Sequence, residues 1–520
     1  MVKFNHFAPN CTLPDETPVG FIQAPNIRTT MQIVWGCFSV ILLCTWSILH
    51  LNVPPELTAK TKWQWIYRKL FLLFRKVYWM GVMLITPEFL TTFTTKKMLG
   101  TKKNVERLKK MAEEVKVEWT VSHAILADIG GIVIKFPDAD SADGDENSSP
   151  NTSSSGSLLP SEPNQEARTS LEALGALESQ EARLLEKITE DDKDYEFIRL
   201  FTRRQNRWLG GCEIPWKPLP AHMKHAKEAK RLLPEGSLRW KTENIAALSG
   251  NVWTLDSKQL AIARDCGIIN KLPDIKLADI EDKNKSDALV KLLAILQVAW
   301  IVVQLCARVY AGLPFAPLEL TTVAFSATAI ILYSIEWEKP KDVNSPVYIL
   351  AAKHCENYAD FEAIVNASPF PYMQLPFLQT KHYYMPSVAA HGTDGNMRHI
   401  DAEAFIVALI TVVSFGGIHL FAWNLKFPTP IEGLLWKISA IITIACPTLY
   451  VSSHMPFMGQ SPNDVTKKMA MKIKAVVALT SFFYVFARLF LITESIRSLY
   501  YLPREAFIAT SWTADLPHMT

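Results

Sequence analysis

Several signatures of common protein classes are missing from this 520-residue sequence. Its eight cysteines are scattered and form no CxxC pair, which excludes a disulfide framework and a zinc ribbon. The net charge is only +3, too small an excess to predict nucleic acid as a partner. A Walker loop, a dinucleotide fingerprint, a GxSxG elbow and an HExxH motif are all absent, which removes the commonest enzyme classes. The sequence therefore predicts no cofactor and no bound metal ion.

Long uncharged stretches are present instead. Residues 31–51, MQIVWGCFSVILLCTWSILHL, carry no formal charge, and Pro54 and Pro55 follow them closely. A bilayer span needs roughly 20 consecutive apolar residues, so this stretch predicts a membrane helix. Similar stretches recur at 289–310, 316–336, 404–423, 433–453 and 474–493. We expect an all-α, polytopic helical membrane protein with about six to eight apolar segments, a cytosolic and partly disordered insertion, and the lipid bilayer as its partner.

A further apolar segment at 77–95 is harder to place. Pro87 and Glu88 lie near its middle, and clusters of Lys and Arg flank it on both sides. Loops rich in Lys and Arg stay in the cytosol, so a single crossing would put one basic flank on the wrong side. Two solutions remain open: the segment is re-entrant, or the weaker apolar run at 120–136 crosses back.

The distribution of polar residues predicts the division of the chain. Residues 138–170 are rich in Asp, Ser, Asn and Pro and cannot bury enough apolar surface to order themselves. Basic clusters near 337–341 and 467–474 predict that the insertion is cytosolic and that both termini lie outside, where Asn10 of the NCT sequon would be glycosylated. The expected divisions are 1–30 (polar N-terminal segment), 31–136 (N-terminal membrane segments), 137–170 (disordered linker), 171–288 (soluble helical insertion), 289–336 (central membrane hairpin), 337–403 (polar loop), 404–493 (C-terminal membrane segments) and 494–520 (C-terminal tail).

Polar groups inside membrane segments are the candidate functional residues, because they are costly there. Gln297, Gln304 and Arg308 are spaced by seven and four, which places them on one face of a helix that enters the membrane from a charged start. The competing interpretation is structural. The glutamines would then bind neighbouring helices, and Arg308 would extend to the interface.

The last apolar segment carries a similar stripe, Ser481, Tyr484 and Arg488. Arg488 lies deeper than Arg308, and the available carboxylates are Glu88 and Glu319. A buried Glu–Arg pair is expected because an unpaired charge would be heavily penalised, and such a pair is more often structural than functional. Pro87 would free a backbone carbonyl next to Glu88, so this position is the best single candidate for a functional site.

Histidines give a weaker signal. His222 and His225 have a spacing that suits one helical face, but no cysteine or acidic residue lies nearby in the sequence. His354–Cys355 and His419 are equally isolated, and we interpret all of them as structural rather than metal ligands.

Several strings resemble a large family of multi-pass membrane proteins of filamentous fungi. They are WGCFSVILLCTWSILHLNVPP at 35–55, ITPEFL at 85–90, DIEDKNKSDALVKLLAILQVAW at 279–300, EWEKPKDV at 336–343 and FARLFLITESIRSLYYLP at 486–503. That family has no assigned reaction, so the resemblance implies a fold and a membrane location and no catalytic residues. Glu88 and the Gln297 face belong to the shared strings, whereas 138–170 has no counterpart.

Three functions fit these observations. The first is a transporter, channel or receptor-like protein that handles a small solute, favoured by Glu88, Arg308, Arg488 and the proline-interrupted segment. The second is a membrane-embedded enzyme of lipid or terpenoid metabolism, disfavoured by the lack of paired carboxylates at metal-binding spacing. The third is a membrane scaffold whose insertion recruits protein partners. The endomembrane system and the plasma membrane are both compatible locations.

Overall fold

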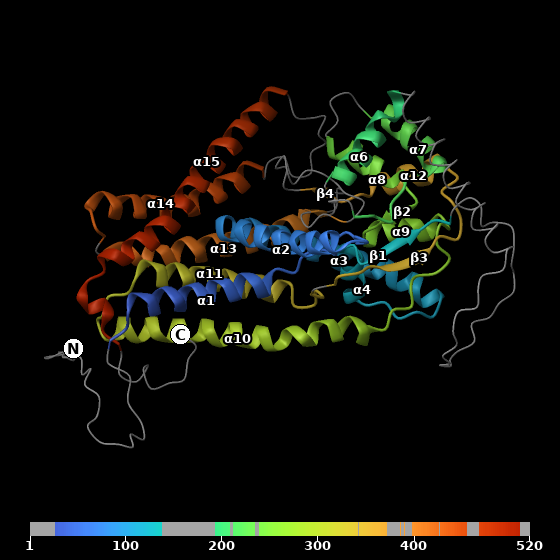
Figure 1. Ribbon diagram of the computed structural model, residues 1–520. Helices are drawn as coiled ribbons and strands as arrows, with labels where there is room; N and C mark the ends of the chain where they lie inside the picture. Colours follow the sequence, from blue (N-terminus) through green and yellow to red (C-terminus); the bar gives the residue numbers. More distant parts are fainter. Residues whose placement is uncertain are drawn as a thin grey trace, which may run out of the picture.

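The computed structural model shows a bundle of long helices joined at one end to a compact domain that contains a small sheet (Figure 1). The structure describes residues 27–137, 193–207, 212–233, 239–341, 343–371, 385, 389–390, 398–425, 427–454 and 467–509. Asn10, the expected linker at 138–170 and the last eleven residues of the tail lie outside these ranges.

Within the described ranges, six helices of the bundle are long and apolar enough to cross a membrane. They are α1 (Thr30–Ile48), α10 (Leu277–Tyr310), α11 (Pro317–Ile335), α13 (Arg398–Leu420), α14 (Pro430–His454) and α15 (Lys467–Arg497). Their outward faces carry large apolar side chains such as Phe482 and Phe486, which only lipid tails would solvate at low cost. The protein is therefore a multi-pass membrane protein, and the expected all-α polytopic fold is confirmed.

Helix α10 joins the two parts of the molecule. It is a single helix of 34 residues that begins in the compact domain and ends at the far end of the bundle (Figure 1). Its last 19 residues, Leu292–Tyr310, form the apolar span. The expected boundary at 288/289 thus falls inside one unbroken helix, as the charged start of the segment indicated.

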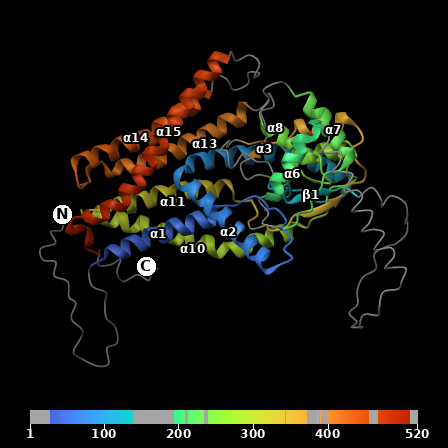
Figure 2. The same cartoon turned by 45° about the horizontal axis from the view of Figure 1, so that its top comes forward.

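The apolar segment at 77–95 is not one helix. It is divided between α2 (Lys62–Ile85) and α3 (Pro87–Glu114), whose axes meet at 108°. Thr86, between them, has φ −134° and ψ 57°, and proline disfavours helical geometry in the residue before it. Pro87 itself is well suited to the first position of α3, where its missing N–H costs nothing. The chain therefore turns back sharply at Thr86, and Figure 2 shows α2 running obliquely to its neighbours.

The second solution for this region, a crossing at 120–136, is wrong. These residues form the eight-residue helix α4 (Val121–Asp128) and the strand β1 (Ile132–Lys135), both buried in the compact domain. A helix of this length cannot span a bilayer. Gly130 makes the turn between the two elements with φ +82°, a conformation that glycine adopts without strain.

A three-stranded sheet forms the centre of the compact domain, in the order β2–β1–β3. Strand β2 (Val252–Thr254) is antiparallel to β1, with Ile134 opposite Trp253, and β3 (Val347–Leu350) is parallel to β1. Residues 337–403, expected to be a polar loop, therefore supply a strand of this sheet. They also form α12 (Tyr358–Asn366) and the short pair β4 (Phe370–Pro371) and β5 (Ala389–Ala390).

Helices surround the sheet. The end of α3 and all of α4 pack with η2 (Lys193–Tyr195), α6 (Glu196–Arg207), α7 (Pro220–Arg231), α8 (Arg239–Leu248) and α9 (Ser257–Asp265). The shared core includes Phe136, Trp253, Leu260 and Phe361, each at most 1% exposed. Residues 171–288 were expected to form a separate soluble insertion. Their described part instead shares one hydrophobic core with residues that precede and follow it in the sequence.

Short 3-10 helices close the far end of the bundle. They are η3 (Phe421–Asn424), η5 (Ser498–Tyr501) and η6 (Arg504–Phe507). Ile27, just before α1, pairs with Ile508, just after η6. Because the six spans are even in number, the start of α1 and the end of α15 lie together, away from the compact domain (Figure 1).

Candidate functional site

Several buried polar networks tie the described helices together, and the first lies at the break between α2 and α3. In an unbroken helix, the carbonyls of Leu84 and Ile85 would accept from the fourth residue ahead. Here Arg488 of α15 donates to both, Nε to Ile85 O at 3.0 Å and NH2 to Leu84 O at 3.0 Å. The hydroxyl oxygen of Tyr484 also lies 3.0 Å from Ile85 O. The last helix thus satisfies the backbone that the break exposes.

Glu88 completes this site from the first turn of α3. Its Oε2 accepts a hydrogen bond of 2.6 Å from Tyr484, and its Oε1 lies 3.8 Å from Arg488 NH1. Both charged side chains are almost fully buried, with 3% of Glu88 and 1% of Arg488 exposed. An anion at the start of α3 and a cation at the end of α2 also complement the two helix dipoles. The arrangement is an intramembrane ion pair centred on a broken helix.

One carboxyl oxygen of this pair lacks a hydrogen bond. Glu88 Oε1 is buried and has no hydrogen-bond partner among the described residues, since 3.8 Å is too long for a hydrogen bond. The backbone and Tyr484 hold the other groups of the site at 2.6 to 3.0 Å. The site is therefore built around a carboxylate with spare capacity for a proton or a ligand.

Aromatic rings and His419 surround Arg488. The guanidinium carbon lies 3.7 Å from the centre of the Phe415 ring and 5.5 Å from that of Phe325. His419, one turn after Phe415 on α13, is fully buried; its Nδ1 contacts Phe415 O at 2.8 Å, and Trp436 donates to its carbonyl at 3.1 Å. Its Nε2 has no hydrogen-bond partner in the described part of the chain. An association of His419 with Glu88 could not be predicted from the sequence, because 331 residues separate them.

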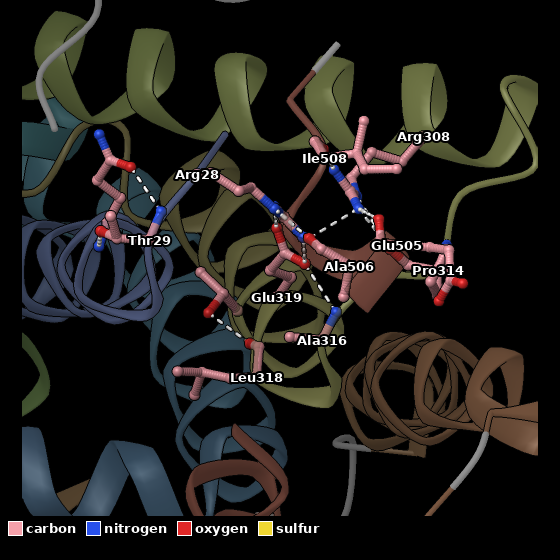
Figure 3. A network of polar contacts seen from close by, with 12 residues as sticks. Arg28, Thr29, Arg308, Pro314, Ala316, Leu318, Glu319, Glu505, Ala506 and Ile508 are labelled. Carbon is pink, nitrogen blue, oxygen red and sulfur yellow. Dashed lines mark hydrogen bonds and ion pairs between the residues drawn. The ribbon is translucent and has the colours of Figure 1, made fainter. Parts of the chain in front are cut away.

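The second network lies at the far end of the bundle (Figure 3). Glu319, in the first turn of α11, pairs with Arg28, whose NH2 lies 3.0 Å from Oε2, and caps its own helix through Ala316 N at 2.7 Å. Arg28 also donates from Nε to Ala506 O at 2.7 Å. Glu319 thus forms an ion pair with Arg28, two residues before α1, and not with Arg308 or Arg488.

Arg308 belongs to this second network. It donates to Pro314 O at 2.6 Å, to Ile508 O at 2.7 Å and to Ala506 O at 2.9 Å, and it is 2% exposed (Figure 3). Arg308 thus lies in the last turn of its span, buried against the protein. Its side chain binds carbonyls of the α10–α11 connection and of η6 and the residue after it, so it holds η6 against the end of α10. Gln297 and Gln304 lie half-buried on α10, and no hydrogen bond within the described ranges joins them to Glu88.

The isolated histidines of the sequence are brought together in the compact domain. The rings of His222 and His354 lie 6.1 Å apart, His222 Nδ1 contacts Gly250 O at 2.9 Å, and His225 Nε2 contacts Cys355 O at 3.0 Å. Burial lowers the pKa of His222 to about 4 and raises the pKa of Cys355 to about 12, so both are neutral near pH 7. Over the residues that the structure describes, no group of three or more His, Cys, Asp or Glu side chains could hold a metal ion.

A last polar cluster lies where the bundle meets the compact domain. Glu336, just after α11, binds Lys339 at 2.7 Å and His50 at 3.2 Å. Burial alone would raise the pKa of Glu336, but Lys339 and His50 outweigh it and hold that pKa at about 2. Lys97 on α3 donates to Asn52 Oδ1 at 3.0 Å beside this pair. These contacts fix α1, α3 and α11 to one another at the domain end.

Comparison with protein families identifies the group to which the chain belongs. A model described as a family of unknown function (DUF8562) matches residues 1–156 and 260–367, half of the chain. The chain belongs to this family. The matched ranges contain Glu88, Arg308 and Glu319, while Tyr484 and Arg488 lie beyond them. No curated protein and no solved structure matches the chain significantly.

Proposed function

We propose that this protein is a carrier that moves a small solute across the membrane, with Glu88 as the group that exchanges a proton during the cycle. The observation behind the proposal is Glu88 Oε1, which lies buried beside Arg488 at a helix break and accepts no hydrogen bond from the described residues. A buried carboxyl group that lacks full hydrogen bonding is costly, so purely structural packing would favour a different residue.

The broken helix supports the same function. Binding sites of many transporters are formed by discontinuous helices near the middle of the bilayer, where helix ends face the solute. Here the end of α2 and the start of α3 meet beside Tyr484 and Arg488. Tyr484 can pass a proton to or from Glu88 because the two oxygens are 2.6 Å apart. Protonation of Glu88 would weaken its attraction to Arg488 and so favour a different arrangement of α3 and α15.

The orientation of the protein forms part of the proposal. The basic residues of α2 and of the second half of α3 lie on the side of the compact domain, which supports a cytosolic domain. The residues before α1 and after α15 then face the lumen or the cell exterior, where Asn10 would be glycosylated. Such a protein would reside in the endomembrane system or the plasma membrane.

Proton flux through the purified full-length chain provides the test. The protein is reconstituted into vesicles that contain a pH-sensitive dye, and a potassium diffusion potential drives proton entry. We expect flux above that of empty vesicles, loss of this flux in Glu88→Gln, and full flux in Glu403→Gln, whose carboxyl is exposed at the start of α13. Absence of flux in the wild type, or flux in Glu88→Gln equal to that of the wild type, overturns the proposal.

Metabolite profiling distinguishes the carrier from the membrane-embedded enzyme. Cells that lack a carrier retain its solute on one side of the membrane, whereas cells that lack an enzyme accumulate a precursor. The comparison uses cells that express either the wild type or Glu88→Gln at matched abundance. Redistribution of one compound without a new precursor supports transport, and accumulation of a precursor contradicts it.

A further inference from the structure

Helix α2 presents an unusual surface for part of a membrane bundle. One stripe along it is apolar and strongly exposed, formed by Trp63, Ile66, Leu70, Phe74 and Val77, with 80% of Trp63 and 70% of Phe74 exposed. The spacings of three and four residues align these side chains on one face. Such a face is stable only in contact with an apolar medium.

A ridge of lysines runs along one edge of this stripe. Lys62, Lys69 and Lys76 recur every seven residues. Seven residues are close to two helical turns, so the three side chains lie nearly in line along the helix. Helix α2 contains five basic residues and no acidic one. An apolar face bordered by lysines is the pattern of a helix that lies in the membrane interface, with cations at the level of the lipid phosphates.

Contacts with α1 and with the residues after it fix the position of the lysine ridge. Lys76 Nζ lies 3.9 Å from the centre of the Trp46 ring, and Trp46 is two residues from the end of α1 that faces the compact domain. Arg75 NH2 donates to Asn52 O at 2.6 Å, beyond that end of α1. The middle of α2 is therefore level with the point where the spans leave the membrane.

The other face of α2 is occupied by the compact domain. Tyr67 and Phe71 pack against Leu57 and Cys212, the lysine ridge lies on the opposite side of the helix, and the exposed apolar stripe lies between them. The chain bends by 108° between α2 and α3, so α2 does not continue along the axis of α3. Helix α2 is therefore directed away from α3, with its basic edge on the side opposite the compact domain.

We infer that α2 is a lipid-recognition element, in which Lys62, Lys69 and Lys76 bind the phosphates of anionic phospholipids in the leaflet next to the compact domain. Charge complementarity identifies the lipid, because the ridge is purely cationic and zwitterionic headgroups offer no net charge to it. The apolar stripe then contacts the acyl chains of the same lipids. This inference does not depend on transport activity.

A thermal-shift titration of the full-length protein tests the inference. Phosphatidylglycerol or phosphatidylcholine is added to protein in neutral detergent micelles, and the unfolding midpoint is followed as a function of lipid concentration. A lipid that binds the folded state raises this midpoint in a saturable manner. We expect a saturable rise with phosphatidylglycerol and a much smaller one with phosphatidylcholine.

Variants locate the site. Lys62→Gln/Lys69→Gln/Lys76→Gln should raise the half-saturating concentration of phosphatidylglycerol about tenfold, whereas Lys62→Arg/Lys69→Arg/Lys76→Arg should leave it unchanged. A matched control, Lys102→Gln/Lys103→Gln/Lys109→Gln, removes three exposed lysines of α3 and should behave as the wild type. If the triple glutamine variant does not fold, Lys69→Gln alone should give a smaller increase in the same direction.

Two results overturn the inference. One is an unchanged half-saturating concentration in the folded glutamine variant. The other is an equal rise in the unfolding midpoint with inorganic phosphate, because a soluble anion would then account for the effect without a lipid. Sodium chloride should weaken the response to phosphatidylglycerol, since exposed charges are screened.

Discussion

The hydroxyl of Tyr484 donates a hydrogen bond of 2.6 Å to Glu88 Oε2 across 396 residues of sequence. This contact joins α15, the last span, to the break between α2 and α3 near the start of the chain. The same hydroxyl lies 3.0 Å from Ile85 O, so it contacts both the end of α2 and the start of α3. The geometry of the break therefore depends on a side chain from the opposite end of the chain.

Removal of this hydroxyl should destabilise the protein. Tyr484→Phe leaves Glu88 Oε2 buried without its donor, and we expect the free energy of unfolding to fall by about 1–3 kcal/mol. Thermal unfolding of the purified protein measures the effect. Tyr500→Phe is the matched control, since Tyr500 is 86% exposed and should change the midpoint little. Equal midpoints for the two variants would contradict this role of Tyr484.

Two adjacent glycines on α13 should respond in opposite ways to the same substitution. A Cβ on Gly416 would lie 2.2 Å from Ile444 Cγ1 of α14, whereas a Cβ on Gly417 would meet no atom within 4 Å. We expect Gly416→Ala to cost about 1–3 kcal/mol through separation of the two helices. Gly417→Ala should be neutral or stabilising by up to about 1 kcal/mol. Unfolding of both variants in the same detergent provides the comparison, and a neutral Gly416→Ala would show that α13 and α14 do not pack this closely.

The stability of the compact domain should depend on the protonation of His222. Its pKa is lowered from 6.5 to about 4, so the folded state binds a proton less readily than the unfolded chain does. This stabilisation is complete above pH 6.5 and is lost as the pH falls to about 4. Between pH 7 and pH 4, the wild type should lose about 2–3 kcal/mol more than His222→Asn. Chemical unfolding at both pH values measures the difference, and parallel losses in the two proteins would refute it.

Membrane topology gives a direct test of the sharp turn at Thr86. Glycosylation acceptors inserted at 60, 116 and 345 should remain unmodified, because all three positions lie on the side of the compact domain, which we propose is cytosolic. Acceptors inserted at 312 and 427, in the α10–α11 and η3–α14 connections, should be modified. Modification at 60 but not at 116 would show that α2 and α3 together cross the membrane once.

The apolar spans and the continuity of α10 could be predicted because each is encoded by a local run of residues. The break at Pro87 was also local, since proline restricts both itself and Thr86. The sheet could not be predicted in this way. Its strands contain three or four residues and come from Ile132, Val252 and Val347, so only the folded chain brings them together.

The candidate site could likewise be predicted from the sequence only in part. The sequence identified Glu88, Tyr484 and Arg488 as costly polar groups in apolar surroundings. It did not show which carboxylate each arginine meets, and Arg28, which pairs with Glu319, lies outside any apolar stretch. Pairing depends on how the helices are arranged around α11, and that arrangement is set by side-chain packing over the whole bundle.

The uninterrupted course of α10 has a mechanical consequence. A straight helix of 34 residues is a rod of about 50 Å, and bending it without a proline or an inserted polar group is difficult. Arg308 anchors one tip of this rod beneath η6, while the other tip is embedded among the helices around the sheet. A rotation of the compact domain would therefore be transmitted along α10 to Arg308 and η6 at the other end of the bundle.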